Sequence, residues 1–427
     1  MTELVHRVAL VDAAGRLVRG PLPLDDSWPS PRDLREAVGA PAAVEVVPAW
    51  RDTDGVIVHV LQDAAAAGDG DPWMPAAARL AQRATGGGGS WAEWYRPEWL
   101  SDVDVWTSAA LAGHGLRRVA DPEIVTWWAL SAVLRLSVAP LDAPSSNGSA
   151  VDDPDGGVRD VWFKATCEGF RDEPVITAAL ARWPGEPGRQ APLPAVLAID
   201  PERAWMLLGD VPGAGDEPEL PTVLAAASAM AHLQLASIGR DDPALPVRDA
   251  PATIRALESV VQGSVEASLM TDDLRAAARA ALPRLAGAVR ALYGCALPLT
   301  LVHGDLHTQN LAGTAAHPVI FDWTDACRAH PYLDGRLLAG SAVRRRPGGA
   351  DADEVASAVR TAFTEPWRAA YPGVDHDHVW ELAGDALEVF QLVSYEAIQR
   401  AQPAGSRWAL EGVITEKLTR LTVGGGA

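Results

Sequence analysis

The most constraining stretch of this sequence is a pair of short apolar runs, each of which leads into polar residues. One run ends at Val302 and leads into His303-Gly-Asp-Leu-His-Thr-Gln-Asn310, and the other ends at Phe321 and leads into Asp322. An Asp or Asn that follows a strand is usually a turn former, so no residue here is informative alone. The joint spacing predicts two short strands that hold two carboxylates and an amide at one site.

The residue types in this stretch suit the transfer of a phosphoryl group. Such a reaction asks a protein to hold phosphates and a divalent cation, and to aim a hydroxyl group in line. We expect Asp305 to orient that hydroxyl or to accept its proton. Asn310 and Asp322 supply oxygen ligands of the kind that Mg²⁺ takes beside nucleotide phosphates. His303 would brace the loop by hydrogen bonding, and Asp325 would either bind the acceptor or brace the loop.

The stretch resembles the aminoglycoside phosphotransferase and choline kinase group of small-molecule kinases. The resemblance rests on His303 to Asn310 and on Ile320-Phe-Asp-Trp323, and Gly304, where protein kinases have Arg, favours this group over protein kinases. Asp322-Trp-Thr-Asp325 is also similar to the maltokinase and glucosamine-kinase branch. The resemblance covers about residues 120 to 400. It implies an α+β, bilobal, protein-kinase-like fold with ATP or GTP between the lobes and the acceptor against a helical C-lobe.

The segment before this stretch carries the other half of the implied nucleotide site. Alternating apolar residues predict strands over Ile124–Leu130, Ala132–Val138, Val161–Ala165, Ala195–Ile199 and Ala204–Leu208. Lys164, one of only two lysines, matches the lysine that pairs the α- and β-phosphates. Glu173, where a helix begins, matches its ion-pair partner, although an isolated Lys and Glu are by default surface residues. Leu207, Leu208 and Gly209 match the hinge whose backbone would bind adenine.

One element of protein kinases is missing. The glycine-rich loop Gly-x-Gly-x-x-Gly is absent between Thr126 and Leu136. Phosphate binding would then fall to Ser131, Ala132 and backbone N–H groups. No Ala-Pro-Glu signature follows at a suitable distance, which also disfavours a protein substrate. His307 fits equally well a residue that packs within the loop.

We predict three domains, at residues 1–88, 91–212 and 213–427. The first is a small α+β unit with a hairpin over Val8–Arg19, a helix over Pro31–Val38 and strands over Ala43–Val47 and Val56–Leu61. In position it resembles the cap domains of the maltokinase-like branch, and Thr85-Gly-Gly-Gly-Gly-Ser90 is a flexible linker by composition. In the third domain, three- and four-residue apolar spacing predicts helices over Pro221–Ile238, Ala252–Leu269, Leu274–Leu292 and, roughly, 351–371, 377–401 and 408–421.

Composition excludes some classes of protein. A net charge of −20 argues against nucleic-acid binding. It fits either surface charge for solubility or a cationic substrate. No run of eighteen apolar residues predicts a membrane span, and the N-terminus has no basic-then-apolar leader. Cys167, Cys295 and Cys327 are too few and too widely spaced for a disulfide framework or zinc site, so we expect free thiols and a cytoplasmic protein.

The predicted function is ATP-dependent transfer of a phosphoryl group to a hydroxyl of a small molecule, with Mg²⁺ as cofactor. A sugar or aminosugar is the first expectation for the acceptor, and an aminoglycoside-type antibiotic is the alternative. A different class of function is a catalytically silent, kinase-like binding module. The five polar positions needed for catalysis are all present, which favours an enzyme.

Overall fold

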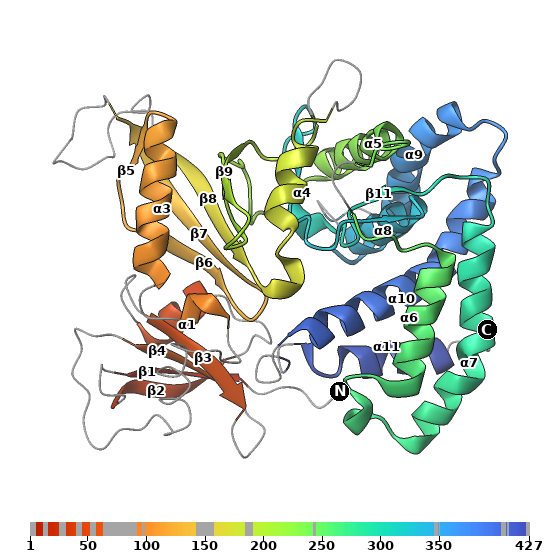
Figure 1. Cartoon of the computed structure of the whole chain (residues 1–427), viewed down its shortest axis with the longest axis horizontal. Helices are drawn as coiled ribbons and strands as arrows, with labels where there is room; N and C mark the ends of the chain where they lie inside the picture. Colours follow the sequence, from red (N-terminus) through yellow and green to blue (C-terminus); the bar gives the residue numbers. More distant parts are fainter. Residues whose placement is uncertain are drawn as a thin grey trace. The chain divides into compact units, whose positions relative to one another are not determined.

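The computed structural model describes residues 6–11, 16–24, 31–39, 45–51, 57–62, 92–95, 99–141, 158–183, 191–241, 245–345, 349, 351–402, 407 and 410–423. The chain forms two compact units of mixed helix and sheet, which confirms the α+β class (Figure 1). The first unit comprises Met1–Arg171, Glu202–Asp210 and Ala401–Leu410, and the second comprises Asp172–Pro201, Val211–Arg400 and Glu411–Ala427. The two units are described separately below.

The first unit begins with a four-stranded sheet in the order β2-β1-β4-β3. Its elements are β1 (His6–Val11), β2 (Leu17–Leu24), α1 (Pro31–Val38), β3 (Glu45–Arg51) and β4 (Ile57–Gln62). The helix α1 packs on the sheet because Leu34 and Val38 bury against Val8, Leu10 and Leu61. The predicted hairpin, helix and two strands are therefore confirmed. The predicted linker at residues 85–90 lies outside the described residues.

A second sheet of this unit runs β5-β7-β8-β10, with β6 also paired to β7. Its strands are β5 (Leu116–Arg118), β6 (Glu123–Trp127), β7 (Ser131–Pro140), β8 (Arg159–Thr166) and β10 (Trp205–Leu208), all paired antiparallel. The helix α3 (Trp99–Gly113) covers this sheet with aromatic side chains. Trp99 lies edge-on to Phe163 and Trp205, at 5.7 and 5.9 Å between ring centroids. Edge-to-face pairs of this kind add to the free energy of burial.

The second unit is mainly helical. Its elements are α4 (Glu173–Leu180), β9 (Val196–Asp200), α5 (Leu220–Ala236), α6 (Ala250–Gly263), η3 (Ala267–Leu269), α7 (Asp272–Tyr293), β11 (Thr300–Val302), η4 (Thr308–Asn310), β12 (Leu311–Gly313), β13 (Pro318–Ile320), β14 (Cys327–Ala329), α8 (Tyr332–Arg345), α9 (Ala352–Ala370), α10 (His376–Ala401) and α11 (Val413–Val423). The predicted helices at these places are confirmed with shifted ends.

One prediction in this unit was wrong in detail, and one helix was not predicted. The helix expected over Ala252–Leu269 ends at Gly263, because Ser264 takes an extended conformation with ψ 153°. The helix α8 was not predicted. It is buried on nearly every side, from Tyr332 to Ala342, so it lacks the apolar stripe that marks a surface helix in sequence.

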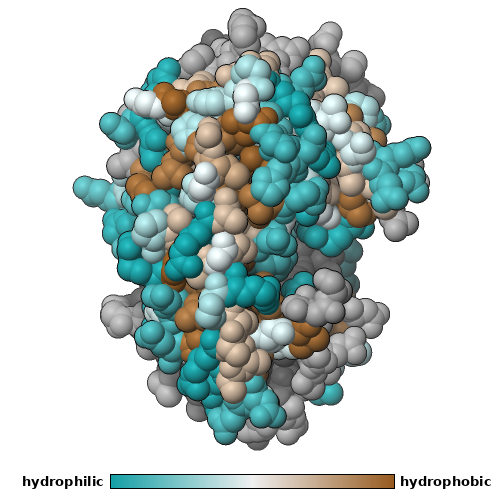
Figure 2. Space-filling model, turned by 90° about the vertical axis from the view of Figure 1, so that its right-hand side faces the viewer, coloured by the Kyte–Doolittle hydropathy of each residue, from teal (hydrophilic) through white to brown (hydrophobic). Residues whose placement is uncertain are grey.

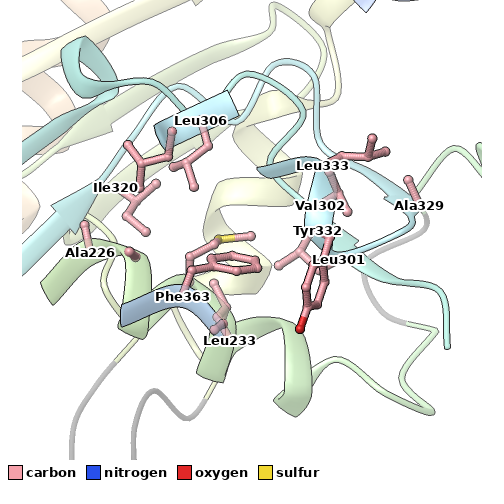
Figure 3. Close-up of a cluster of buried hydrophobic side chains, with 14 of the residues drawn as sticks. Ala226, Leu233, Leu301, Val302, Leu306, Ile320, Ala329, Tyr332, Leu333 and Phe363 are labelled. Atoms are coloured by element: carbon pink, nitrogen blue, oxygen red, sulfur yellow. The ribbon is translucent and has the colours of Figure 1, made fainter. Parts of the chain in front are cut away.

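The apolar residues of the opening stretch belong to the main core of the second unit. Leu301, Val302, Leu306 and Ile320 are fully buried there. Figure 3 shows them beside Leu233 of α5, Phe363 of α9 and Tyr332 of α8. The short strands of the motif are thus stabilised by packing against helices, since pairs of three-residue strands have little stability of their own.

The surface mixes hydrophilic and hydrophobic residues. On the face in Figure 2, hydrophobic residues form short groups between hydrophilic ones. In the described part of the chain no helix is long and apolar enough to cross a membrane. The three cysteines are free thiols, as predicted.

Candidate active site

The loop after β11 turns sharply at Gly304. This residue has φ +86°, and a Cβ atom built there would lie 2.4 Å from the carbonyl oxygen of Asp325. Both the left-handed conformation and the close approach exclude a side chain. Gly304 is therefore required by the packing of the loop against the segment after β13, whatever the substrate.

His303 ties this loop to the second strand of the motif. Its ring is fully buried, Nε2 donates to the carbonyl oxygen of Phe321 at 3.0 Å, and Nδ1 accepts from the backbone N–H of Asp305 at 3.3 Å. Burial lowers the pKa of His303 to about 4. The neutral ring with its hydrogen on Nε2 satisfies both contacts.

Asp334, which the sequence analysis missed, anchors the same loop. One carboxylate oxygen accepts from the backbone N–H of His303 at 2.9 Å and the other from that of Gly304 at 3.0 Å. Gln234 of α5 donates to Asp334 as well, at 3.0 Å. Burial raises the pKa of the Asp334 carboxyl to about 7, although these three N–H donors act in the opposite direction. An acidic residue in the first turn of a helix is ordinarily a surface residue, so the sequence held no signal of this role.

Other distant side chains satisfy further backbone groups of the motif. Ser237, at the end of α5, accepts from the N–H of Leu301 at 2.9 Å. Ser341 of α8 accepts from the N–H of Thr308 at 3.1 Å. Irregular backbone in a protein interior is stable only when such groups are paired. The motif is thus held by polar side chains from two helices as well as by its own strands.

Glu173 makes a contact that its predicted role does not explain. It is almost completely buried at the start of α4, and its Oε1 accepts from the backbone N–H of Trp323 at 3.1 Å. Trp323 directly follows Asp322. Glu173 therefore helps to fix the backbone at the end of the second strand of the motif.

Asn310 directly precedes β12 and Asp322 follows β13, and these two parts of the motif are joined through the backbone. The N–H of Phe321 donates to the carbonyl oxygen of Asn310 at 3.1 Å. Asp322 has φ +66°, an unusual value for a residue other than glycine, and Thr324 donates to its Oδ1 at 2.9 Å. Conformations of this kind cost about 1–3 kcal/mol and cluster at functional sites.

Asp305 combines a fixed backbone with an accessible side chain. Its carbonyl oxygen accepts from Nδ2 of Asn310 at 2.9 Å, and its N–H donates to His303. Its side chain is 41% exposed, and Oδ2 lies 3.3 Å from Nε2 of His307. The predicted catalytic carboxylate, a predicted metal ligand and the bracing histidine therefore meet in one loop.

Asp325 is buried beside this loop. Its Oδ1 lies 3.8 Å from Nη2 of Arg248, and Nη1 of the same arginine donates to Ser394 of α10 at 2.5 Å. The carbonyl oxygen of Asp325 faces Gly304. Asp325 thus adjoins both the loop that carries Asp305 and the side of the unit that carries α10.

The remaining predicted site residues lie in the first unit. Lys164 is buried in β8, where it pairs with Val133 of β7 and Met206 of β10. Ser131 begins β7, and its hydroxyl accepts from Nε1 of Trp128 at 3.0 Å. Leu207 and Leu208 are buried in β10, and Gly209 follows them. The predicted ion pair between Lys164 and Glu173 stays a prediction.

Comparison with known proteins bears on the second unit. Residues 188–375 match the family model described as the phosphotransferase enzyme family. Over these residues the chain is similar to that family. The match contains the whole motif from β11 to Asp325. It confirms the predicted resemblance, and with it that the chain is a phosphotransferase of the small-molecule kinase type. No curated protein matches the sequence.

Solved structures with remote similarity include the following three proteins. A choline/ethanolamine kinase family protein from Mesorhizobium loti is 12% identical, with 76% of this chain and 94% of that chain covered and a TM-score of 0.46. A fructosamine-3-kinase homologue from Thermobifida fusca is 16% identical, with coverage of 74% and 98% and a TM-score of 0.45. An aminoglycoside phosphotransferase from Streptomyces rimosus is 17% identical, with coverage of 67% and 98% and a TM-score of 0.38.

Proposed function

We propose that this phosphotransferase moves the γ-phosphoryl group of ATP or GTP to a hydroxyl group of a sugar or aminosugar. The observation that carries the proposal is a contrast within one loop. Buried side chains fix the backbone around Asp305, whereas its carboxylate is 41% exposed. An accessible carboxylate on a fixed backbone suits a residue that must meet a hydroxyl group in line with a phosphoryl donor. Asp305 is the catalytic residue of this proposal.

Asn310 and Asp322 would hold Mg²⁺. Asn310 commits its Nδ2 donor to the carbonyl oxygen of Asp305, which leaves the amide oxygen as its ligand atom. Asp322 contributes a carboxylate that Thr324 orients. Two oxygen ligands suit Mg²⁺, which completes its shell with waters and nucleotide phosphates. When bound, the cation neutralises charge on the phosphate oxygens.

Apart from Glu173, the residues that would bind the nucleotide belong to the first unit. Lys164 would pair the α- and β-phosphates with Glu173 as its ion-pair partner, and Ser131 with backbone N–H groups would replace the absent glycine-rich loop. The backbone at Leu207, Leu208 and Gly209 would bind adenine. The domain boundaries at residues 1–88, 91–212 and 213–427 belong to the same proposal.

The charges near Asp305 support an acceptor that carries an amino group. The pKa of Tyr395 on α10 is raised to about 12, first by burial and then by the charges of Asp305, Asp325 and Glu388. Arg344 acts in the opposite direction, and Asp325 and Glu388 each have a cationic partner, Arg248 and Lys417. The exposed carboxylate of Asp305 is what favours a cationic acceptor over an anionic one.

The test is ATP consumption with Mg²⁺ across sugars, aminosugars, aminoglycosides and choline-like alcohols. We expect an aminosugar or sugar to stimulate turnover most strongly. Stimulation by aminoglycosides alone would favour the antibiotic-directed alternative. If no acceptor stimulates turnover and ATP does not bind, the chain is a silent binding module and the proposal is wrong.

A further inference from the structure

We infer that His307 is a positioning residue that holds the carboxylate of Asp305 in its reactive orientation. The inference rests on the proposed function, in which Asp305 meets the acceptor hydroxyl. It assigns His307 a role that loop packing does not require. Three features of the loop support it.

The first feature is the contact itself. Nε2 of His307 lies 3.3 Å from Oδ2 of Asp305. Among the side chains that the structure describes, it makes the one polar contact recorded for this carboxylate. The torsion that turns a carboxylate about its Cβ–Cγ bond is broad, so an exposed Asp has no preferred oxygen direction of its own. The contact at Oδ2 restricts that freedom and leaves Oδ1 for the hydroxyl group.

The second feature is that the backbone of His307 is fixed. Its carbonyl oxygen accepts from the N–H of Asn310 at 3.0 Å, and it forms the N-cap of η4. The next residue, Thr308, is buried and bonded to Ser341 of α8 through both its N–H and its hydroxyl, at 3.1 and 3.2 Å. A donor that orients a catalytic group must itself be held in place, and this one is.

The third feature is the other ring nitrogen. Nδ1 of His307 is buried and has no hydrogen-bond partner among the described residues. A hydrogen on Nδ1 would therefore be a buried donor without an acceptor, which costs about 1–3 kcal/mol. With the hydrogen on Nε2 the ring presents an N–H to the carboxylate of Asp305, whereas the other tautomer would present a lone pair to it. His307 is thus placed to donate to the carboxylate rather than to compete for the proton of the acceptor.

These features predict a specific pattern of kinetic change. Loss of the donor would leave nucleotide binding intact, because His307 is not among the residues assigned to phosphates or metal. It would lower kcat, because Asp305 would spend less time aligned with the acceptor. Water serves as the acceptor in the slow hydrolysis of Mg·ATP, so the pattern can be measured before the natural acceptor is known.

The experiment compares His307→Gln with His307→Met. The two side chains have the same length, and only Gln has an N–H donor that can reach the place of Nε2. We expect Met to lower kcat for Mg·ATP hydrolysis about 10- to 100-fold, with KM for Mg·ATP changed less than twofold. Gln should restore kcat to within about threefold of the original chain. His378→Met, at an exposed position of α10, is the control and should leave both constants unchanged.

The kcat values of the two His307 variants either support or overturn the positioning role. Equal kcat in the Gln and Met variants, whether both are high or both low, would overturn the positioning role, since the donor would then make no difference. A thermal melt of each variant shows whether a shared loss comes from unfolding, which would make His307 structural. If hydrolysis of Mg·ATP is no faster than in the Asp305→Asn variant, the same comparison of kcat is made with the acceptor that stimulates turnover. If no acceptor does so and ATP does not bind, the proposed function itself fails. If Asp305→Asn lowers turnover but His307→Gln and His307→Met have the same kcat, the proposed function stands and only the role of His307 is wrong.

Discussion

The strand that carries Lys164 and the loop that carries Asp305 are positioned by different kinds of contact. In β8, every residue from Arg159 to Thr166 pairs with β7, and four of them also pair with β10. Those bonds join backbone to backbone and do not depend on residue type. In the loop, the N–H groups of His303 and Gly304 bond to a side chain about thirty residues away.

The difference predicts how each region responds to substitution. Paired strands keep their backbone hydrogen bonds when one polar side chain is lost. A loop held by buried side chains loses several bonds when one anchor is removed, and each orphaned buried group costs free energy. A single substitution should therefore leave the backbone of β8 in place but displace the backbone of the loop. Four predictions test this comparison.

The largest effect is expected at the exposed end of the loop. Asp305→Asn should lower phosphoryl transfer about a thousandfold or more, because Asn cannot accept the hydroxyl proton. Mg·ATP binding should persist, since Asp305 is not assigned to the nucleotide. Turnover with an acceptor and nucleotide binding by calorimetry measure the two effects. Equal activity in variant and original chain would remove Asp305 from its assigned role.

The anchor of the loop comes next. Asp334→Ala leaves the buried N–H groups of His303 and Gly304 without their acceptor, so the free energy of unfolding should fall by about 3 kcal/mol. Urea unfolding measures this quantity. Asp351→Ala is the matched control, because Asp351 caps α9 at an exposed position and should cost only about 1 kcal/mol. Similar losses in both variants would show that the loop is not fragile.

The strand should show the reverse pattern. Lys164→Ala is expected to lower kcat/KM for ATP about 10- to 100-fold, because the phosphates lose a charged partner. The free energy of unfolding should change less than in Asp334→Ala, because the ladder of β8 stays intact. ATP-dependent rates and urea unfolding on the same sample measure both quantities. An unchanged rate at limiting ATP would mean that Lys164 does not bind the nucleotide.

The last effect concerns pH, is small for each pH unit, and arises around the loop. The buried rings of His303 and His330 have pKa values lowered from 6.5 to about 4 and about 3, so the unfolded chain takes up a proton on each as pH falls below 6.5. Asp334 acts in the opposite sense, because its pKa is raised from 3.8 to about 7 and the folded chain keeps a proton that the unfolded chain releases. In this pH range the unfolded chain therefore binds two of these protons and the folded chain binds one. The folded chain consequently loses stability as the pH falls.

Between pH 6.5 and 4 the free energy of unfolding should therefore fall by about 1.4 kcal/mol per pH unit. His330→Asn keeps an acceptor for the backbone N–H of Tyr332 but cannot take up the proton. It should make this slope nearly flat. Urea unfolding at several pH values gives the slope, and an equally steep slope in the variant would contradict the assignment.

Much of the fold was predictable because it follows local periodicity. The hairpin of β1 and β2, the helix α1 and the strands β6, β7, β8 and β10 all lie where apolar alternation or helical spacing placed them. The helix α8 was missed because it is buried on nearly every side and has no polar face to set its period. Helix ends shifted where a single residue such as Ser264 changes the backbone, since periodicity does not define a terminus.

The sequence by itself determined the reaction class and predicted the loop that carries it. The types and spacing of His303, Asp305, Asn310 and Asp322 are local properties, so they can be recognised in the amino-acid sequence. Only the tertiary structure decided what holds that loop. Asp334, Gln234 and Glu173 lie far from Asp305 in sequence and reach the motif only after the helices pack. Burial without water makes their hydrogen bonds necessary, and burial is a property of the folded chain.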